Sequence, residues 1–224
     1  GLIGFTWYGT TSACYSESVV TSTGDNTGGL VGLNGSSNIN NCFSTGSVNG
    51  ASYVGGLVGS HQQYSIVNSY SIGAVSGSGS FVGGLVGDGA SGGWGAKNSF
   101  WNTETSGQVT SSGGIGATTV EMHSLSTYVD GVDAAWDFMF ESLNGSSDIW
   151  GMNATVNGGY PYLAWQGYTH TEECCGIIDI TDPVLSVQNF ALQLDLTGNA
   201  VLLLSDVVLS ATDNCSIADT TLSQ

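Results

Sequence analysis

One tetrapeptide, Gly-Leu-(Ile/Val)-Gly, recurs through the first half of the chain at an almost constant interval. It begins at Gly1, Gly29, Gly56 and Gly84, which gives spacings of 28, 27 and 28 residues. An aromatic column and a valine column keep the same interval: Tyr15, Phe43, Tyr70 and Phe100, and Val20, Val48 and Val75. Three columns with one period indicate that residues 1–103 are stacked copies of one structural unit.

Each repeat consists of short apolar runs separated by Gly, Ser and Asn, which favours short strands and tight turns over helices. A single coil cannot bury its own apolar side chains, but coils stacked about 4.8 Å apart can. We therefore predict an all-β fold, a parallel β-solenoid of about four coils of 27–28 residues. By analogy with other solenoids we expect it to be right-handed. The aromatic column should form one ladder, and an interior ladder should be formed by Leu2, Leu30, Leu57 and Leu85.

Three repeats place an asparagine two residues before the aromatic column, at Asn41, Asn68 and Asn98. These side chains could form an amide ladder across the coils. Alternatively, they occupy turns, because Asn tolerates left-handed backbone conformations. The sequence leaves both interpretations open.

Two stretches of the repeat carry a family resemblance. Residues 41–48, Asn-Cys-Phe-Ser-Thr-Gly-Ser-Val, and residues 54–59, Val-Gly-Gly-Leu-Val-Gly, resemble the bacterial GLUG repeat, as do residues 68–75 and 82–87. The resemblance covers about residues 1–103. It implies a large secreted or surface-anchored, adhesin-like protein, and it supplies no catalytic residues because the family repeat has none.

The segment that follows, residues 104–168, resembles the sequence that often closes such repeats. We predict that it is a solenoid cap, because the last coil otherwise leaves an apolar face and unpaired strand edges. Residues 118–128 are expected to include a short helix. The aromatic side chains expected to cover the open face are Trp136, Phe138, Phe140, Trp150, Tyr160, Tyr162 and Trp165.

Two further segments complete the predicted organisation. Residues 169–182 are polar and acidic, and we interpret them as a linker. Residues 183–224 resemble the first half of an immunoglobulin-like HYR-type module, found in large bacterial surface adhesins that include gliding-motility adhesins. Alternating residues 190–196 and 200–204 predict a hairpin. A sandwich needs about seven strands, so we expect the missing strands beyond Gln224.

Charge and composition exclude several classes of protein. The chain has 18 acidic residues against one basic residue, a net charge of −17. It is therefore not a general nucleic-acid binder and does not dock on anionic membranes. No stretch approaches the roughly 20 continuous apolar residues that span a membrane. Charged residues make up 8% of the chain, against about 25% in average proteins. This composition is typical of extracellular β-rich proteins, and the resemblance to the GLUG repeat implies that the protein is secreted to a bacterial cell surface.

The five cysteines are the first set of candidate site residues. Cys14 and Cys42 occupy one column on adjacent coils, where they either form a disulfide or remain small buried thiols. We expect Cys174 or Cys175 to pair with Cys215. One cysteine is then left for a partner outside these residues.

A calcium site is the second candidate. Asp179, Asp182 and Asp213 would approach one another if the start of the sandwich packs against the Asp-Asn-Cys loop. Their hard oxygen ligands suit Ca²⁺, which would rigidify the linker. The alternative is that these carboxylates are solvated.

Catalysis is the main alternative function, because some β-solenoids cleave polysaccharides. That chemistry requires paired carboxylates on one exposed face. The repeats contain only Glu17, Asp25 and Asp88 as candidates, and no acid recurs beside Glu17 and Asp25 on the next coil. A glycine-rich stretch, residues 87–93, matches nucleotide and nucleophile motifs by letter only, since no helix is expected to follow it.

We therefore predict a non-catalytic segment of a large secreted adhesin, an extended protease-resistant scaffold for attachment to a surface or a polysaccharide. Its partners would be an extracellular surface and the neighbouring domains of a longer chain, and calcium its only cofactor. A carbohydrate-binding module that uses exposed aromatic residues is the other binding function. The candidates for it are Tyr64, Trp94 and Trp101, although Trp94 and Trp101 could equally belong to the transition from coil to cap.

Overall fold

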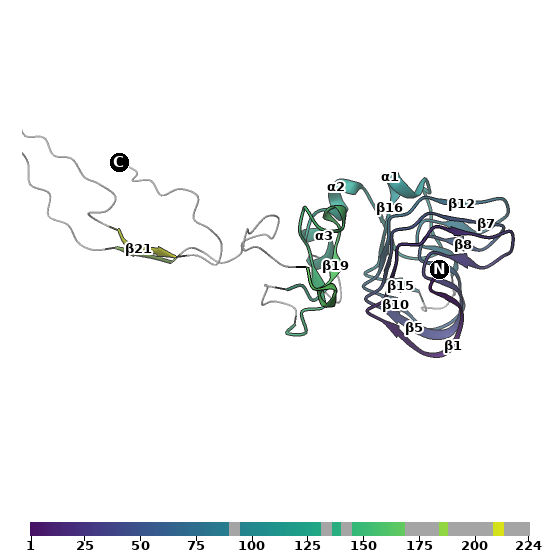
Figure 1. The fold of residues 1–224 in the computed structure, drawn as a ribbon, viewed down its shortest axis with the longest axis horizontal. Coiled ribbons are helices and arrows are strands. Elements are labelled where there is room, and N and C mark those ends of the chain that lie inside the picture. The colour runs from purple at the N-terminus through teal and green to yellow at the C-terminus, as the bar shows by residue number, and fades with distance from the viewer. Residues whose placement is uncertain (90–94, 131–135, 140–144, 169–183, 188–207, 213–224) are drawn as a thin grey trace, which may run out of the picture. The chain divides into compact units, whose positions relative to one another are not determined.

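The computed structural model describes residues 1–89, 95–130, 136–139, 145–168, 184–187 and 208–212. It divides into two units, residues 1–167 and residues 168–224. Parallel strands of the first unit stack into a β-solenoid of about three turns (Figure 1). The predicted all-β solenoid is therefore confirmed, with three complete coils (1–28, 29–55 and 56–83) and a fourth coil that begins at Gly84. The finer division of the chain into four segments stays a prediction.

The elements of the first unit are short, apart from β1 and β5. Its strands are β1 (Ile3–Ser12), β2 (Tyr15–Ser16), β3 (Val20–Thr21), β4 (Thr27–Gly28), β5 (Val31–Asn40), β6 (Phe43–Ser44), β7 (Val48–Gly50), β8 (Val54–Gly55), β9 (Val58–His61), β10 (Ile66–Val67), β11 (Tyr70–Ser71), β12 (Val75–Gly77), β13 (Val82–Gly83), β14 (Val86–Gly89), β15 (Ala96–Lys97), β16 (Phe100–Asn102), β17 (Ile115–Ala117), β18 (Trp150–Gly151) and β19 (Tyr162–Leu163). Its helical turns are α1 (Thr103–Ser106), α2 (Thr119–Met122), α3 (Ser126–Val129), η1 (Asn157–Gly159) and η2 (Ala164–Gln166). In the second unit, β20 (Val184–Val187) pairs antiparallel with β21 (Val208–Thr212).

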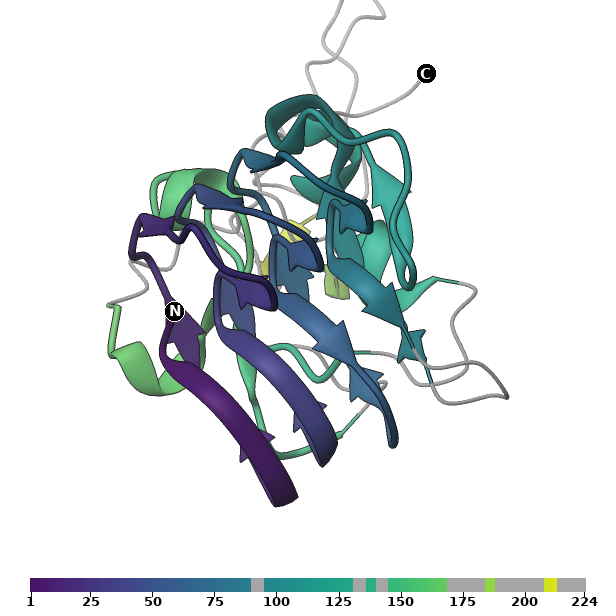
Figure 2. The ribbon, with the colours of Figure 1, turned by 90° about the vertical axis from the view of Figure 1, so that its right-hand side faces the viewer.

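The repeat period sets the pairing of the strands. In the largest sheet the order is β14-β9-β5-β10-β15, and β1 also pairs with β5. Figure 2 shows the long strands of this sheet side by side, from purple β1 to teal β14. The other parallel sheets run β17-β16-β11-β6-β2, β12-β7-β3 and β13-β8-β4. Each pair of neighbouring strands within the repeats thus joins residues that occupy the same column of the sequence repeat.

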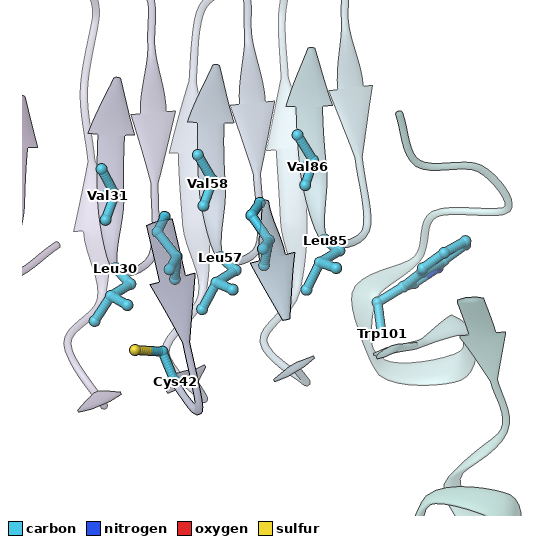
Figure 3. Close-up of a cluster of buried hydrophobic side chains, with 10 residues drawn as sticks. Leu30, Val31, Cys42, Leu57, Val58, Leu85, Val86 and Trp101 are labelled. Atoms are coloured by element: carbon cyan, nitrogen blue, oxygen red, sulfur yellow. The ribbon is translucent and has the colours of Figure 1, made fainter. Parts of the chain in front are cut away.

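The interior is a set of apolar ladders. Leu30, Leu57 and Leu85 are fully buried in one row, and a second row follows at Val31, Val58 and Val86 (Figure 3). Leu2 stands at the head of this ladder, since its neighbour Ile3 pairs with Val31, but its side chain is 58% exposed. The reason is that β1 pairs, among the described strands, with β5 alone.

The aromatic column also stacks as predicted. The rings of Tyr15 and Phe43 have centroids 5.0 Å apart, and those of Phe43 and Tyr70 are 5.1 Å apart and almost parallel. Phe100 continues the column in backbone register opposite Tyr70. Its ring instead meets Tyr128 edge-on at 5.3 Å.

The asparagine column consists of left-handed turns. The backbone φ is +53° at Asn41, +49° at Asn68 and +45° at Asn98, and the first coil has Ala13 at +51° in the same place. The Oδ1 of Asn68 is buried without a hydrogen-bond partner, which an amide ladder would have supplied. The turn interpretation is therefore the correct one, because Asn adopts positive φ more readily than most residues.

Residues 101–117 close the end of the stack. Trp101 stands in the column that holds a serine in the earlier coils, and it packs over Leu85 against the α-carbon of Gly84 (Figure 3). The hydroxyl of Ser111 accepts hydrogen bonds from the amides of Leu85 and Val86. Strand β17 then pairs with β16. The expected helix within residues 118–128 is present as two single turns, α2 and α3.

Candidate functional site

The aromatic segment expected to cover the open end instead lies along the side of the solenoid. We call its described residues, 136–139 and 145–167, the strap. Its three tryptophans bond to three different coils: Trp136 to Asn98, Trp150 to Asn41, and Trp165 to Ala13. The strap therefore spans the stack from the fourth coil to the first, although not in strict chain order, since Asn102 of the fourth coil donates to the hydroxyl of Tyr160, which follows Trp150.

The three strap tryptophans all bind the column of left-handed turns. Each donates its indole N–H: Trp136 to the carbonyl of Asn98 at 2.8 Å, Trp150 to Oδ1 of Asn41 at 3.3 Å, and Trp165 to the carbonyl of Ala13 at 3.0 Å. The third coil is held through the aromatic column. There, the Tyr70 hydroxyl donates to the carbonyl of Pro161 and accepts from Asn157 Nδ2.

Aromatic packing seals the strap against the coils. Trp150 lies 6.1 Å from both Phe43 and Tyr70 and 4.5 Å from Trp136, as measured between ring centroids. Trp136, Trp150 and Tyr70 are fully buried. Burial raises the pKa of the Tyr70 hydroxyl well above its ordinary value, so this group stays protonated. The strap side of the solenoid is thus a hydrophobic core in which the buried Tyr70 hydroxyl and the indole N–H groups of Trp136 and Trp150 are hydrogen-bonded.

Cys14 and Cys42 are free thiols, so of the two alternatives the structure favours separate thiols. The Cys42 Sγ donates to the carbonyls of Asn40 and Thr11, and the Cys14 Sγ donates to that of Ser12. In-register parallel neighbours hold their Cβ atoms too far apart for ideal disulfide geometry. Burial raises the pKa of the Cys42 thiol to about 12, which suppresses its reactivity.

The remaining cysteines and the predicted calcium ligands lie outside the described residues. These positions are Cys174, Cys175, Cys215, Asp179, Asp182 and Asp213. Within the described residues, no group of three or more His, Cys, Asp or Glu side chains could hold a metal ion. Nor does any helix of the described part have the length and apolar character needed to cross a membrane.

Two of the three aromatic residues expected to bind carbohydrate can be placed. Trp101 is buried at the end of the stack, where its indole N–H donates to the carbonyl of Gln108. It therefore belongs to residues 101–117, which close the end of the stack, and its side chain is not available on the surface. Tyr64 is 38% exposed, and Trp94 lies outside the described residues.

A different group of aromatic side chains is exposed on β1. Phe5, Trp7 and Tyr8 are 55%, 52% and 72% exposed. The ring centroids of Phe5 and Trp7 lie 5.8 Å apart with their planes tilted by 33°, and Tyr8 meets Trp7 edge-on at 5.9 Å. We call these three residues the β1 aromatic patch.

The backbone of β1 is irregular where it carries this patch. The pairing with β5 shifts register on both sides of Trp7, and Tyr8 has φ +70° with Gly9 at +116°. A positive φ is a true outlier for a bulky residue. On the neighbouring strand, a Cβ at Gly35 would overlap the indole of Trp7. The bulge and the glycine together allow the indole to lie against the backbone of β5.

A polar ladder lies in register with β1 and inside the same sheet. Thr6 stands opposite Asn34, and Asn34 opposite His61. Asn34 donates to His61 Nδ1 at 3.0 Å, and His61 Nε2 lies 3.0 Å from the carbonyl of Tyr64. Since the carbonyl can only accept, Nε2 carries the proton. Burial lowers the pKa of His61, so the imidazole is neutral at pH 7.

Sequence reasoning missed both the position of the strap and the β1 aromatic patch. The signal for the patch was present in the columns: Phe5 stands opposite Leu33, followed on the next coils by Ser60 and Asp88. The repeat therefore does not require an aromatic residue there.

Comparison with known families supports the repeat itself. Residues 23–49 and residues 50–76 each match the model of the GLUG motif. No curated protein and no solved structure matches the chain. Two tandem GLUG motifs thus form successive coils of a β-solenoid, and the resemblance of residues 183–224 to an HYR-type module stays a prediction.

Proposed function

We propose that this GLUG-repeat solenoid is a non-catalytic segment of a large secreted bacterial surface protein, and that it serves as an extended scaffold for attachment to a surface or polysaccharide. The observation that carries this proposal is the strap. A segment bonded to every coil, from Ala13 through Asn41 and Tyr70 to Asn98, resists the separation of coils under load.

The side chains of the repeats support the same role, because almost none of them is charged. No Asp, Glu, Lys or Arg stands between Asp25 and Asp88. The coils therefore present Ser, Thr, Asn and aromatic groups to solvent, which suit binding better than acid–base catalysis. Extracellular location fits the low content of charged residues and the family of the repeat.

Resistance to proteolysis follows from composition and pairing. Lys97 is the only basic residue of the chain. It lies in β15, where the amide of Asn68 donates to its carbonyl and the hydroxyl of Ser99 donates to the same oxygen. A trypsin-like protease would need to open this strand to cleave the chain. We expect cleavage only under conditions that unfold the solenoid.

Calcium remains part of the proposal as a ligand of the second unit. Val184 pairs with Thr212, and these residues directly follow or precede the stretches that carry Asp182 and Asp213 in the sequence. The proposed Ca²⁺ would bind Asp179, Asp182 and Asp213 and stiffen the linker. Its removal by a chelator would then lower the thermal stability of the second unit without changing that of the solenoid.

One assay tests attachment and catalysis together. The 224-residue chain is passed over beads that carry neutral polysaccharides, acidic polysaccharides or extracellular proteins, with and without Ca²⁺, while new reducing ends are measured. We expect retention on at least one surface without new reducing ends. New reducing ends that disappear in Asp25→Asn or Asp88→Asn would show that the segment is a polysaccharide-cleaving enzyme. Absence of retention on every surface would contradict attachment.

A further inference from the structure

We propose that two stacked aromatic residues of the second and third coils, Tyr53 and Phe81, form a binding site for a neutral polysaccharide. We call this pair the outer aromatic ladder. The inference rests on the proposed attachment function and gives it a location and a ligand class. The pair lies just before β8 and β13, on the far side of the solenoid from β19 of the strap (Figure 1).

The chain is present on both sides of the outer aromatic ladder. The amide of Tyr53 donates to the carbonyl of Ser80 on the third coil, and the carbonyl of Tyr53 accepts from the amide of Thr27 on the first coil. On the other side of Phe81, residues 103–112 close the stack and leave Phe81 51% exposed, with their own Val109 at 91%. The exposure of the ladder is therefore a property of coils and closing residues that the structure describes.

The turn that carries the ladder does not require an aromatic residue. The backbone φ is +57° at Tyr53 and +63° at Phe81, and Asn26 occupies the same turn of the first coil at +58°. Asparagine is common in this left-handed conformation, whereas a bulky side chain there is an outlier. Strained backbone of this kind is concentrated at functional sites. Two coils thus carry aromatic residues where the fold accepts an asparagine.

The two rings form one continuous apolar strip along the stack. Their centroids lie 5.0 Å apart, and their planes are within 4° of parallel. Because Tyr53 covers one face of the Phe81 ring, the exposed half of Phe81 includes its rim and its other face. The C–H faces of sugar rings can pack along such a strip. The rings lie outside the apolar interior beside this turn, which consists of Val20, Val48, Val54, Val75 and Val82.

Hydroxyl groups border the strip. Ser78 and Ser80 precede Phe81 in the third coil, and both are exposed. Among the described residues, no hydrogen bond engages the hydroxyl of Tyr53, Ser78 or Ser80. A hydroxyl donates one hydrogen bond and accepts two, as the hydroxyls of a sugar do. A sugar chain can therefore bond to these groups without breaking a hydrogen bond that holds the fold.

The charges around the ladder favour a neutral ligand. Between Glu17 and Asp88 the only charged residue is Asp25, whose Oδ1 accepts from the amide of Ser52 at 3.0 Å. Asp25 lies two coils from Phe81, about 10 Å along the stack, so it does not pair with a cation on the open face of Phe81. An acidic ligand would find no basic residue in these coils, and the net charge of −17 would repel it.

The size of the strip favours a sugar chain over a protein. Two rings supply its exposed apolar surface, whereas a stable protein interface buries about 800 Å² on each partner. A polysaccharide needs only a narrow apolar strip with hydroxyl groups beside it. The strip also runs along the stack, so that a chain of sugar rings can contact Tyr53 and Phe81 together.

Affinity electrophoresis of the 224-residue chain through gels that contain β-glucan, xylan, galactomannan or dextran tests the site. The variant combines Tyr53→Asn with Phe81→Asn, which places in both coils the residue that the first coil has in this turn. Because asparagine accepts this backbone conformation, the variant should fold. We expect it to bind at least about tenfold more weakly than the wild type, as is common when central aromatic anchors are truncated.

Two controls show whether the rings themselves are responsible. Tyr53→Phe combined with Phe81→Tyr exchanges the two side chains and keeps both rings, so it should bind like the wild type. Val120→Asn removes an apolar side chain that is 80% exposed on α2, and it should also bind like the wild type. Equal weakening in Val120→Asn would show unspecific apolar adhesion and overturn the site.

Circular dichroism and urea unfolding separate a binding site from a purely structural ladder. The double asparagine variant should keep the spectrum of the wild type while its binding is lost. Should the double variant unfold, Phe81→Asn alone gives the result, because it removes the ring with the open face and leaves Tyr53 in place. Undiminished binding by a folded Phe81→Asn would overturn the site.

The outcomes distinguish this site from the proposed function. Equal binding by the double asparagine variant and the wild type would overturn the site while attachment stands. Retention only on acidic polysaccharides would do the same. Retention on protein beads that disappears in the double variant would identify a protein partner and overturn the polysaccharide site. Retention on no surface would contradict attachment, and the site with it.

Discussion

The two aromatic surfaces of this solenoid have opposite environments. On the strap side, Phe43, Tyr70 and Trp150 are completely buried and their polar atoms are bonded within the protein. On β1, Phe5 and Trp7 keep about half of their surface in water. Buried aromatic residues stabilise the fold, whereas exposed ones are free to contact a ligand. Aromatic content alone therefore does not locate a binding site in a repeat protein.

Truncation of one tryptophan on each side is the strongest test of this contrast. Trp150→Ala should lower the free energy of unfolding by about 3–5 kcal/mol, since it removes a fully buried ring packed on Phe43, Tyr70 and Trp136. Trp7→Ala should lower it by only about 1 kcal/mol, because about half of its indole remains in water. Urea unfolding measures both. Similar losses in the two variants would show that the β1 side is also part of the core.

Glycines in the coils sharpen the comparison between the stacked coils and the edge strand. A Cβ at Gly73 would overlap the carbonyl of Gly46 on the preceding coil, whereas nothing lies within 4 Å of a Cβ at Gly4 on β1. Gly73→Ala should therefore destabilise the protein by about 1–3 kcal/mol. Gly4→Ala should be neutral or slightly stabilising, because it restricts the unfolded chain. Thermal unfolding measures the melting temperatures of the two variants. An unchanged melting temperature in Gly73→Ala would mean that the coils can separate locally at small cost.

The sequence was sufficient for the coils but not for the strap. Leu30, Leu57 and Leu85 share a column because the period of the repeat equals one turn of the solenoid. The aromatic ladder from Tyr15 to Tyr70 follows from the same period. The strap has no such period, and its contact from Trp165 to Ala13 spans 152 residues. A pairing of that separation depends on the path of the whole chain.

The β1 aromatic patch could be predicted only in part, for a related reason. The aromatic residues Phe5, Trp7 and Tyr8 are visible in the sequence, but their exposure depends on a bulge and on Gly35 of the next coil. From the sequence alone, Trp101 stayed open between a binding residue and the transition from coil to cap, although its column already marked it, since a tryptophan replaces Ser16, Ser44 and Ser71 there at the end of the stack. A break in a repeat column is thus informative about the ends of a solenoid.

His61 supplies a pH test of the polar interior beneath the β1 side. Its neutral form is favoured in the fold, because burial lowers its pKa and Nδ1 accepts a hydrogen bond from Asn34. The unfolded chain binds a proton below its ordinary pKa of about 6.5 and the folded chain does not. Stability should therefore fall as the pH drops below about 6.5, by at most about 1.4 kcal/mol per pH unit from this group.

The matched variant for this test is His61→Gln, which keeps hydrogen-bonding capacity without titrating in this range. We expect it to be less stable than the wild type at pH 7.5 but to lose less stability between pH 7 and pH 5. Chemical unfolding at several pH values measures the difference. An identical pH dependence in both proteins would show that His61 is already protonated, or solvated, in the folded state.

The smallest expected effects concern the left-handed turns beneath the strap. Asn68 has φ +49° and makes no hydrogen bond through its Oδ1, so its backbone conformation is its main contribution. Asn68→Ala should cost about 1 kcal/mol, because an L-residue with a Cβ is strained there, and Asn68→Gly should change stability by less than about 0.5 kcal/mol.

Ala13 occupies the same turn at φ +51° in the first coil. Its replacement by glycine should stabilise the protein by up to about 1 kcal/mol, since the relief of strain exceeds the entropy lost by the unfolded chain. Differential scanning calorimetry resolves both signs, and a loss of stability in Ala13→Gly would show that Trp165 requires the alanine side chain and not only its carbonyl.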